Sequence, residues 1–292
     1  MRAFLFPGQG SQFVGMGQDL HDAHVEAKKL FAQADEILGF SLSEIMFTGT
    51  EEELKATNVT QPAVFVHSII KLKTASNLAK PDAVAGHSLG EFSALVAAES
   101  LSFEDALQLV ARRADEMQKA CETIDSTMAA IVGLEDSKVE KVCAEIDDII
   151  VAANYNCPGQ LVISGTKPAI AKAIDILKAE GARMAVELPV GGAFHSPLME
   201  PAKEGLKAAI ENIQFGTPRC AIYQNIDGIA ERDADKIKEK LIQQLTAPVR
   251  WTSTLQNMLN DGYDHFTEIG GKGNVLRGML KRIDRKIASE TV

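Results

Sequence analysis

The sequence lacks paired cysteines, long apolar runs and an N-terminal leader pattern. Its four cysteines are widely and unevenly spaced, with no C-x-x-C pair that would predict a zinc site or a dithiol redox centre. We therefore expect free thiols, a reducing compartment and no metal. No run approaches the ~20 apolar residues of a membrane-spanning helix, and Met1 leads directly into an apolar strand. These absences favour a cytoplasmic protein without a membrane partner.

The sequence also lacks a surplus of basic residues and a phosphate-binding loop. It has 30 Lys and Arg against 40 Asp and Glu, a formal net charge of -10. Contacts to nucleic-acid phosphates need a basic face, so this balance argues against a nucleic-acid partner. Neither a Walker A pattern nor G-x-G-x-x-G occurs, and Gly270–Gly273 has no hydroxyl residue to complete such a loop. Nucleotide binding is therefore unsupported.

Strands that alternate with helices predict an α/β protein with a mostly parallel sheet. We expect strands at 2–6 and 82–85 and helices at 22–38, 62–78 and 91–98. At 292 residues the chain is long enough for one large domain with a smaller addition.

Between residues 126 and 189 the pattern changes to strand, helix, strand, strand, helix, strand, which is the order of a ferredoxin-like unit. A turn at 156–159 joins the middle strands. We expect an α/β-hydrolase-like catalytic subdomain, formed by 1–125 and 190–292, into which 126–189 is inserted as a small subdomain. The crevice between two such bodies is a usual place for a substrate.

A G-x-S-x-G pattern spans Gly86–Gly90, between a predicted strand and a predicted helix. This is the context of a nucleophile elbow, in which a sharp turn presents the serine hydroxyl beside the free N–H groups of a helix N-terminus. Ser88 is therefore the candidate nucleophile.

A serine hydroxyl needs a base, and His195 is the best placed of six histidines. It lies between a glycine-rich loop and Ser196-Pro197, which is typical of a helix start. The other five histidines are expected to be surface or core residues. No acidic residue follows His195 at an obvious triad spacing, so a backbone carbonyl is the alternative orienting group.

Two further polar residues have both structural and functional interpretations. Arg113 falls at the edge of the apolar stripe of a helix that begins at Ser102, where Asp105 completes a capping box. Its guanidinium would form either a structural ion pair or a bidentate contact with a substrate carboxylate. Gln9 follows the first strand and would either cap its own turn or supply an oxyanion-hole donor.

The combined motifs resemble those of the malonyl-CoA:acyl carrier protein transacylases of fatty-acid synthesis. The resemblance spans nearly the whole chain, and its motifs are at 6–12, 86–91, 156–163, 194–199, 225–228 and 248–251. The chain departs from the family pattern at Gly191–Ala193, at Cys157 and in the loop from Glu268 to Leu276, where it carries one extra residue. These departures affect the expected loop shapes and leave the chemical residues in place.

The resemblance implies a ping-pong transfer. Ser88 would be acylated by malonyl-CoA, His195 would act as base and then as acid, and Arg113 would bind the malonyl carboxylate. The phosphopantetheine thiol of an acidic acyl carrier protein would take the malonyl group. The resemblance implies no permanently bound cofactor, and we expect a monomer.

The resemblance also assigns supporting roles. Gln9 and the Leu89 backbone N–H would form the oxyanion hole, and the main-chain carbonyl of Arg250 would orient the histidine. Phe194, directly before the base, would crowd an α-methyl branch and favour malonyl over methylmalonyl groups.

Two other functions stay open from the residues alone. A serine hydrolase could use the same elbow, and a non-catalytic acyl-binding module would need only the pocket. Two clusters of basic residues are candidates for the site at which an acidic carrier protein would dock. They are the C-terminal Arg277, Lys281, Arg282, Arg285 and Lys286, and the small-subdomain Lys167, Lys172, Lys178 and Arg183. Each cluster could equally be a solvated helix face.

Overall fold

The computed structural model describes residues 1–76 and 78–292. A six-stranded sheet forms the centre, with the order β10-β9-β1-β2-β7-β8, and all of its neighbours are parallel except β8, which is antiparallel to β7. Its strands are β1 (Arg2–Phe6), β2 (Ala83–Gly86), β7 (Ala221–Tyr223), β8 (Ala230–Glu231), β9 (His265–Glu268) and β10 (Ala288–Thr291). The predicted α/β class with a parallel-rich sheet is confirmed.

Strands β1 and β2 are neighbours in parallel register, and Phe6 lies opposite Gly86. Their carboxyl ends therefore reach the same edge of the sheet. The loop that follows β1 carries Gln9, and the turn that follows β2 carries Ser88. The sheet thus brings together two segments that are almost 80 residues apart in the chain.

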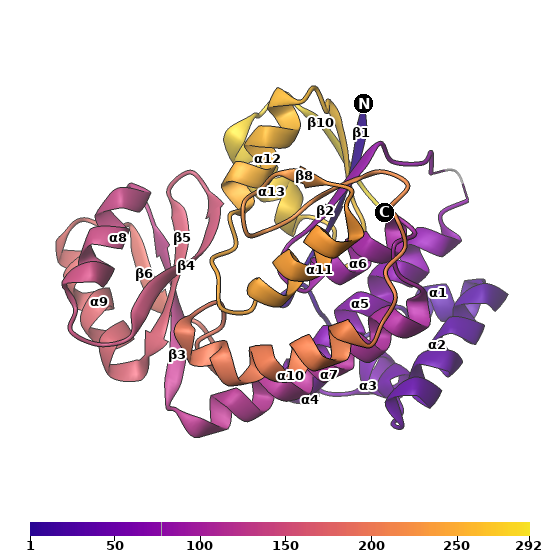
Figure 1. The fold of residues 1–292 in the computed structure, drawn as a ribbon, viewed down its shortest axis with the longest axis horizontal. Coiled ribbons are helices and arrows are strands. Elements are labelled where there is room, and N and C mark those ends of the chain that lie inside the picture. The colour runs from indigo at the N-terminus through magenta and orange to yellow at the C-terminus, as the bar shows by residue number, and fades with distance from the viewer. Residues whose placement is uncertain (77) are drawn as a thin grey trace.

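Helices cover both faces of the sheet (Figure 1). Because side chains alternate along a strand, Phe4 and Phe6 pack into one core and Ala3 and Leu5 into another. The first core includes residues of α2 (Val25–Leu38), α3 (Leu42–Thr48), α4 (Glu51–Lys55), α5 (Thr57–Thr74), α6 (Gly90–Ala97), α7 (Phe103–Thr123), η1 (Pro197–Met199), α10 (Glu200–Glu211) and α11 (Ala234–Gln243). The second includes α12 (Trp251–Asn260) and α13 (Val275–Ile283).

Residues 126–187 form a separate antiparallel sheet with the order β4-β5-β3-β6. Its elements, in chain order, are β3 (Ser126–Val132), α8 (Asp136–Glu145), β4 (Ile150–Cys157), β5 (Gln160–Thr166), α9 (Lys167–Ala179) and β6 (Met184–Glu187). One face packs on α8 and α9 through residues such as Ile131 and Ile163. The other face carries Met128 and Val162, which join the first core of the large sheet.

Two predicted helices have different bounds in the structure. The helix expected at 22–38 is two helices, because His24 is extended between α1 (Gln18–Ala23) and α2. The helix expected from Pro62 begins at Thr57 instead, so that Pro62 lies inside it, and it ends at Thr74. Residue 77, within that expected helix, lies outside the described residues. Proline is common in the first turn of a helix, whereas Pro62 lies beyond the first turn of α5.

Candidate active site

The turn after β2 has the close packing that a nucleophile elbow requires. Ser88 has a positive φ of 52°, a strained conformation for a residue other than glycine. A Cβ on Gly86 would lie 1.9 Å from the carbonyl carbon of Gly90, and one on Gly90 would lie 2.1 Å from the Phe6 oxygen. Both flanking positions therefore require glycine, and the turn leaves Ser88 exposed to a cavity.

His195 lies within hydrogen-bond distance of Ser88, as expected from the sequence. Its Nε2 is 2.7 Å from Ser88 Oγ. His195 has a φ of 57° and sits between β6 and η1. The next residue fixes this turn, because Ser196 Oγ accepts from the Leu198 N–H and donates to the Ala193 carbonyl. The structure therefore joins a strained nucleophile to a base on a constrained loop.

The carbonyl that orients His195 belongs to Gln244, so the assignment to Arg250 is wrong. His195 Nδ1 lies 2.9 Å from the Gln244 main-chain oxygen. The Arg250 carbonyl instead accepts from the N–H and the hydroxyl of Thr254, in the first turn of α12. A carbonyl can only accept, so Nδ1 carries the proton and Nε2 is free to accept the proton of Ser88.

Burial keeps the His195 imidazole neutral. The side chain is buried, and desolvation, together with the nearby Arg113 charge, lowers the pKa of His195 to about 3. The Gln244 carbonyl opposes this shift because it stabilises the protonated ring. At neutral pH the ring is therefore in the form that accepts a proton from the nucleophile.

Arg113 lies deep in the same cavity, on α7, and only 1 % of it is exposed. Its Nη1 donates to Gln61 Oε1 at 2.6 Å. Its Nη2 donates to Ser88 Oγ at 3.0 Å and to Gln244 Oε1 at 3.1 Å. Within the described residues Arg113 has no carboxylate partner closer than 4.0 Å, and its Nε has no hydrogen-bond partner. The guanidinium charge is therefore available to an anion beside the nucleophile.

The two predicted oxyanion-hole donors also lie at the cavity. Gln9 and Leu89 line it together with Ser88. The described residues supply no acceptor for the Leu89 N–H, which belongs to the N-cap residue of α6. Gly8 holds the Gln9 loop against the elbow, since a Cβ on Gly8 would lie 2.5 Å from the His87 oxygen. A side-chain amide and a backbone N–H thus both lie near the serine.

The cavity has a volume of about 360 Å³ and is lined by residues of both bodies. Apolar side chains supply most of its wall, namely Met117, Met128, Val162, Leu188, Pro189, Val190 and Phe194. Phe194, which directly precedes the base, is 6 % exposed. A small acyl group would therefore be enclosed by apolar walls, with the charge of Arg113 at its inner end.

Sequence reasoning missed three polar residues that hold the site together. Asn225 Oδ1 accepts from the Ser88 N–H at 2.6 Å, and its Nδ2 donates to the Gly86 carbonyl at 2.7 Å. Gln61 and Gln244 bond to Arg113. Asn225 falls in a motif that matches the family, which was its only signal, whereas Gln61 lay outside the helix expected from Pro62.

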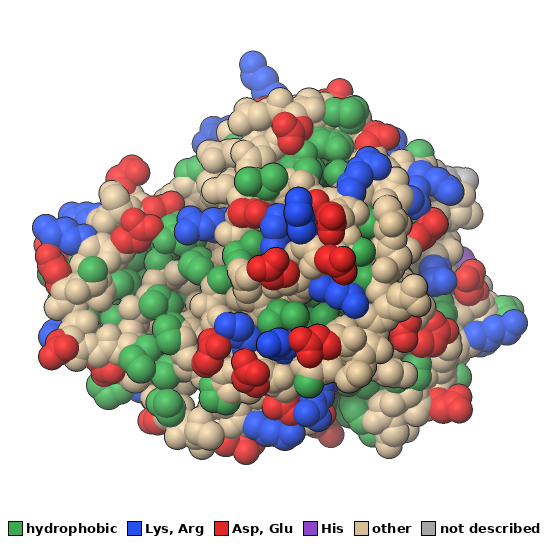
Figure 2. Space-filling view, viewed as in Figure 1, with side chains coloured by type: hydrophobic (Ala, Val, Ile, Leu, Met, Phe, Trp, Pro, Cys, Tyr) green, Lys and Arg blue, Asp and Glu red, His purple; other side chains and the backbone are tan. Residues whose placement is uncertain are grey.

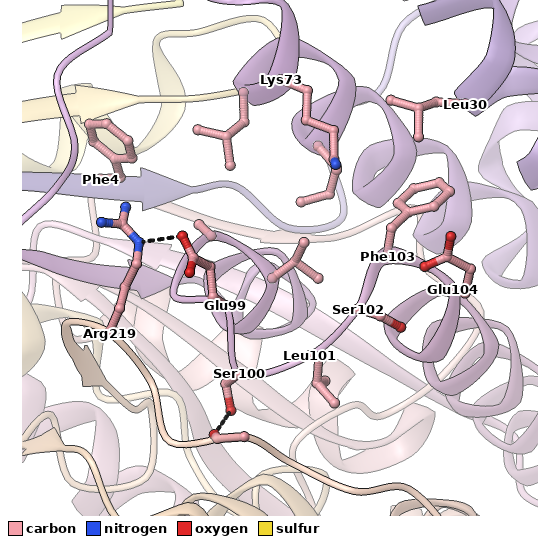
Figure 3. Close-up of a pocket in the computed structure, with 15 residues that line it drawn as sticks. Phe4, Leu30, Lys73, Glu99, Ser100, Leu101, Ser102, Phe103, Glu104 and Arg219 are labelled. Atoms are coloured by element: carbon pink, nitrogen blue, oxygen red, sulfur yellow. Dashed lines mark hydrogen bonds and ion pairs between the residues drawn. The ribbon is translucent and has the colours of Figure 1, made fainter. Parts of the chain in front are cut away.

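A larger hollow elsewhere lacks comparable chemistry (Figure 3). It has a volume of about 630 Å³ and lies beside Phe4, between the ends of α5 and α6 and the start of α7. Two pairs of its polar groups bond to each other, since Arg219 Nε lies 3.1 Å from Glu99 and Ser100 Oγ donates to the Gly216 carbonyl. No histidine lines it, so it contains no serine and base couple.

Two searches of the described residues concern other kinds of site. Over 1–76 and 78–292, no three His, Cys, Asp or Glu side chains are grouped so that they could hold a metal ion. No helix in this part of the chain is both long and apolar enough to cross a membrane.

Comparison with known proteins agrees with this geometry. Residues 3–292 match the family described as acyl transferase domain. The chain is 42% identical over 294 residues to the malonyl CoA-acyl carrier protein transacylase of Bacillus subtilis, covering 99% of this chain and 92% of that protein. An acyl carrier protein S-malonyltransferase structure from Vibrio cholerae matches with a TM-score of 0.94, 40% identity and coverage of 100% and 96%.

A second solved structure is a malonyl-transacylase in complex with a type II PKS acyl-carrier protein. It matches with a TM-score of 0.95 and 39% identity, over 100% of this chain and 95% of that chain. Both the sequence and the structure of this chain are therefore similar to those of these proteins over the whole length that is compared. The chain belongs to the acyl transferase family.

Proposed function

We propose that this protein transfers the malonyl group of malonyl-CoA to the phosphopantetheine thiol of acyl carrier protein, through a malonyl ester of Ser88. The observation that carries this proposal is the Arg113 guanidinium, buried 3.0 Å from Ser88 Oγ and without a carboxylate partner among the residues that the structure describes. A cation this close to the nucleophile matches an acyl group with a carboxylate only a few bonds from its carbonyl. Relatives that are named malonyl transacylases support the same substrate.

In the first half-reaction, Ser88 Oγ attacks the thioester carbonyl while His195 Nε2 takes the hydroxyl proton. The negative oxygen that forms accepts hydrogen bonds from Gln9 and the Leu89 N–H. The C–S bond then breaks, and coenzyme A leaves with the proton from His195. In the second half, the carrier thiol gives its proton to His195 and attacks the ester, and Ser88 regains a proton. These steps use no permanently bound cofactor.

Phe194 is proposed to set selectivity for the acyl group. It lines the cavity beside His195, where a branch on the α-carbon of the acyl group would meet its ring. We expect malonyl-CoA to react much faster than methylmalonyl-CoA in a steady-state comparison of the two thioesters. Comparable turnover of both would exclude this role.

The two bodies are proposed to be an α/β-hydrolase-like catalytic subdomain, 1–125 and 190–292, and a ferredoxin-like subdomain, 126–189. The strand order β4-β5-β3-β6 with two helices on one face supports the second assignment. All catalytic groups named above come from one chain, which supports a monomer as the working form. We place it in the cytoplasm, where its substrates would be made.

We propose that an acidic carrier docks on one of the two basic clusters. Figure 2 shows basic and acidic side chains interspersed over the face that carries α10 and α11, without a single basic patch there. In the small-subdomain cluster, Lys167 is paired with Asp125 at 2.6 Å. This lysine belongs to α9, which packs on the sheet face opposite the one that carries Val162. Charge reversal of each cluster, with carrier KM as the readout, identifies the docking site, and a cluster whose reversal leaves KM unchanged is excluded.

Intact-mass measurement after mixing the protein with malonyl-CoA tests the proposed function. We expect the wild-type chain to gain one malonyl group and Ser88→Ala to gain none. Ser93→Ala, which removes a buried hydroxyl from α6, the helix that follows the elbow, should still be acylated. A wild-type protein that binds malonyl-CoA without a covalent adduct would instead be a non-catalytic acyl-binding module.

A further inference from the structure

Glu91 is a buried carboxylate to which the mechanism above gives no role. It lies in the first turn of α6, three residues after Ser88, and only 1 % of it is exposed. Each of its oxygens accepts a hydrogen bond from a different segment. Oε1 accepts from the main-chain N–H of Asn225, and Oε2 accepts from Gln244 Nε2 at 2.7 Å.

Both of these donors hold catalytic groups directly. The Asn225 side chain accepts from the Ser88 N–H at 2.6 Å, which fixes the strained elbow. Gln244 offers its main-chain oxygen to His195 at 2.9 Å and its side-chain oxygen to Arg113 at 3.1 Å. Its Nε2 also donates to the Ser88 carbonyl at 2.9 Å. Glu91 is thus bonded directly to both Asn225 and Gln244, the two residues that contact Ser88, His195 and Arg113.

The contacts fit the ionised form of Glu91. Burial raises the pKa of Glu91 to about 8, although the Asn225 and Gln244 N–H donors and the Arg113 charge act against that rise. Both oxygens face N–H groups, so neither has an acceptor for a carboxyl proton. The α6 N-terminus further favours a negative charge at this position.

We propose that Glu91 is a positioning residue for acyl transfer, which joins Asn225 and Gln244 into one frame that fixes Ser88, His195 and Arg113. This inference rests on the proposed function, because the reaction defines which geometry has to be maintained. Glu91 touches no reacting atom. It acts only through Asn225 and Gln244, which accept hydrogen bonds from the catalytic groups or donate hydrogen bonds to them.

The chain contains a matched control for this role. Glu268 is equally buried, and its carboxylate accepts from the N–H groups of Val275, Leu276 and Arg277 at the start of α13. It therefore caps a helix and bonds to no residue of the catalytic network. Replacing either glutamate by glutamine turns one acceptor oxygen into an amide donor that faces an N–H group.

The test compares Glu91→Gln with Glu268→Gln after intact-mass titration has counted the sites that malonyl-CoA can acylate. We expect kcat per acylated site to fall on the order of 10²-fold in Glu91→Gln, as small misplacements of catalytic groups do. KM for malonyl-CoA should change much less, because Arg113 keeps its bond to Gln61. Glu268→Gln should lose thermal stability and keep its rate per site.

A Glu91→Gln variant with the wild-type rate per site, or with no greater loss than Glu268→Gln, would overturn the proposal. If Glu91→Gln does not fold, Glu91→Asp replaces it, since aspartate keeps the charge and is too short to reach both donors. An unchanged kcat per site in Glu91→Asp would then be the contradicting result. A wild-type protein that is never acylated would refute the proposed function and not the role of Glu91.

Discussion

The two bodies of this protein contribute unequally to the cavity between them. The parallel-sheet body supplies the side chains assigned to the chemistry, namely Ser88, His195, Arg113 and Gln9, whereas the antiparallel sheet lines the cavity with Met128, Asn154 and Val162. Sheet geometry accounts for Ser88 and Gln9, which follow the parallel strands β2 and β1. Parallel strands direct their carboxyl ends, and the helix N-termini that follow them, to one edge, where polar groups converge. The antiparallel sheet contributes mainly apolar side chains to the cavity, and these can exclude water.

The division extends to the histidines. All six histidines lie outside residues 126–189. If the comparison is right, substitutions in the parallel-sheet body should change the catalytic rate, the substrate preference and the loss of stability in acid.

The largest expected effect is that of His195→Ala. Without the base, Ser88 must lose its proton to water, and we expect kcat to fall by roughly 10⁴-fold. Stopped-flow measurement of coenzyme A release gives the rate. His67→Gln, which changes another buried histidine of the same body, should retain nearly full activity. A comparable loss of kcat in both variants would mean that the loss in His195→Ala comes from disturbed folding and not from the removal of a base.

Gln9→Ala tests the contribution of the loop after β1. Loss of one oxyanion-hole donor should lower kcat by about 10² to 10³-fold with little change in KM. Gln18→Ala, on the nearby helix α1, is the control and should behave as wild type. A loss below ten-fold in Gln9→Ala would show that this amide does not bind the developing oxyanion.

Arg113→Ala should change specificity more than it changes the reaction itself. A charge-assisted hydrogen bond is worth about 2 kcal/mol, so the preference for malonyl-CoA over acetyl-CoA should fall about 30-fold. The ratio of the two kcat/KM values is unaffected by the fraction of folded protein. Arg112→Ala, which removes an exposed arginine paired with Glu116, should leave the ratio unchanged. Unchanged malonyl transfer in Arg113→Ala would exclude the carboxylate-binding role.

The smallest effect concerns acid stability. Burial lowers the pKa of His67 to about 4, so between pH 6.5 and pH 4 the unfolded chain binds a proton that the folded chain does not. His67 therefore lowers stability as the pH falls, by up to about 2 kcal/mol at pH 5. Denaturant unfolding at pH 7 and pH 5 should show a smaller acid loss in His67→Gln. Equal losses in the two proteins would contradict this account.

The sequence contained much of the local structure because local physics determines it. Gly86 is required by a contact with Gly90 within the turn itself, and Ser196-Pro197 starts η1 as expected. Arg113 was placed toward the interior by helical periodicity alone. The capping box at Ser102 is present in part, since Ser102 accepts from the Asp105 N–H while the Asp105 carboxylate bonds to the Ser102 hydroxyl.

What the sequence could not show is which distant polar groups meet. Gln244 approaches His195, Arg113 and Glu91 only because the end of α11 passes over the elbow, and no spacing in the chain encodes that approach. The family resemblance assigned the orienting carbonyl to Arg250, six residues from Gln244, and no spacing in the chain could correct that assignment. Glu91 likewise resembled an ordinary first-turn acidic residue until its two donors, from Asn225 and Gln244, could be identified.

The most direct test of the proposed reaction is to isolate the acylated protein, free of malonyl-CoA, and to follow where the malonyl group goes. After addition of acyl carrier protein with its phosphopantetheine arm, we expect the group to move to the carrier thiol much faster than it is lost to water. Mass spectrometry of both proteins over time measures the two routes. Release of free malonate at the same rate with and without the carrier would identify a hydrolase and contradict the proposed transfer.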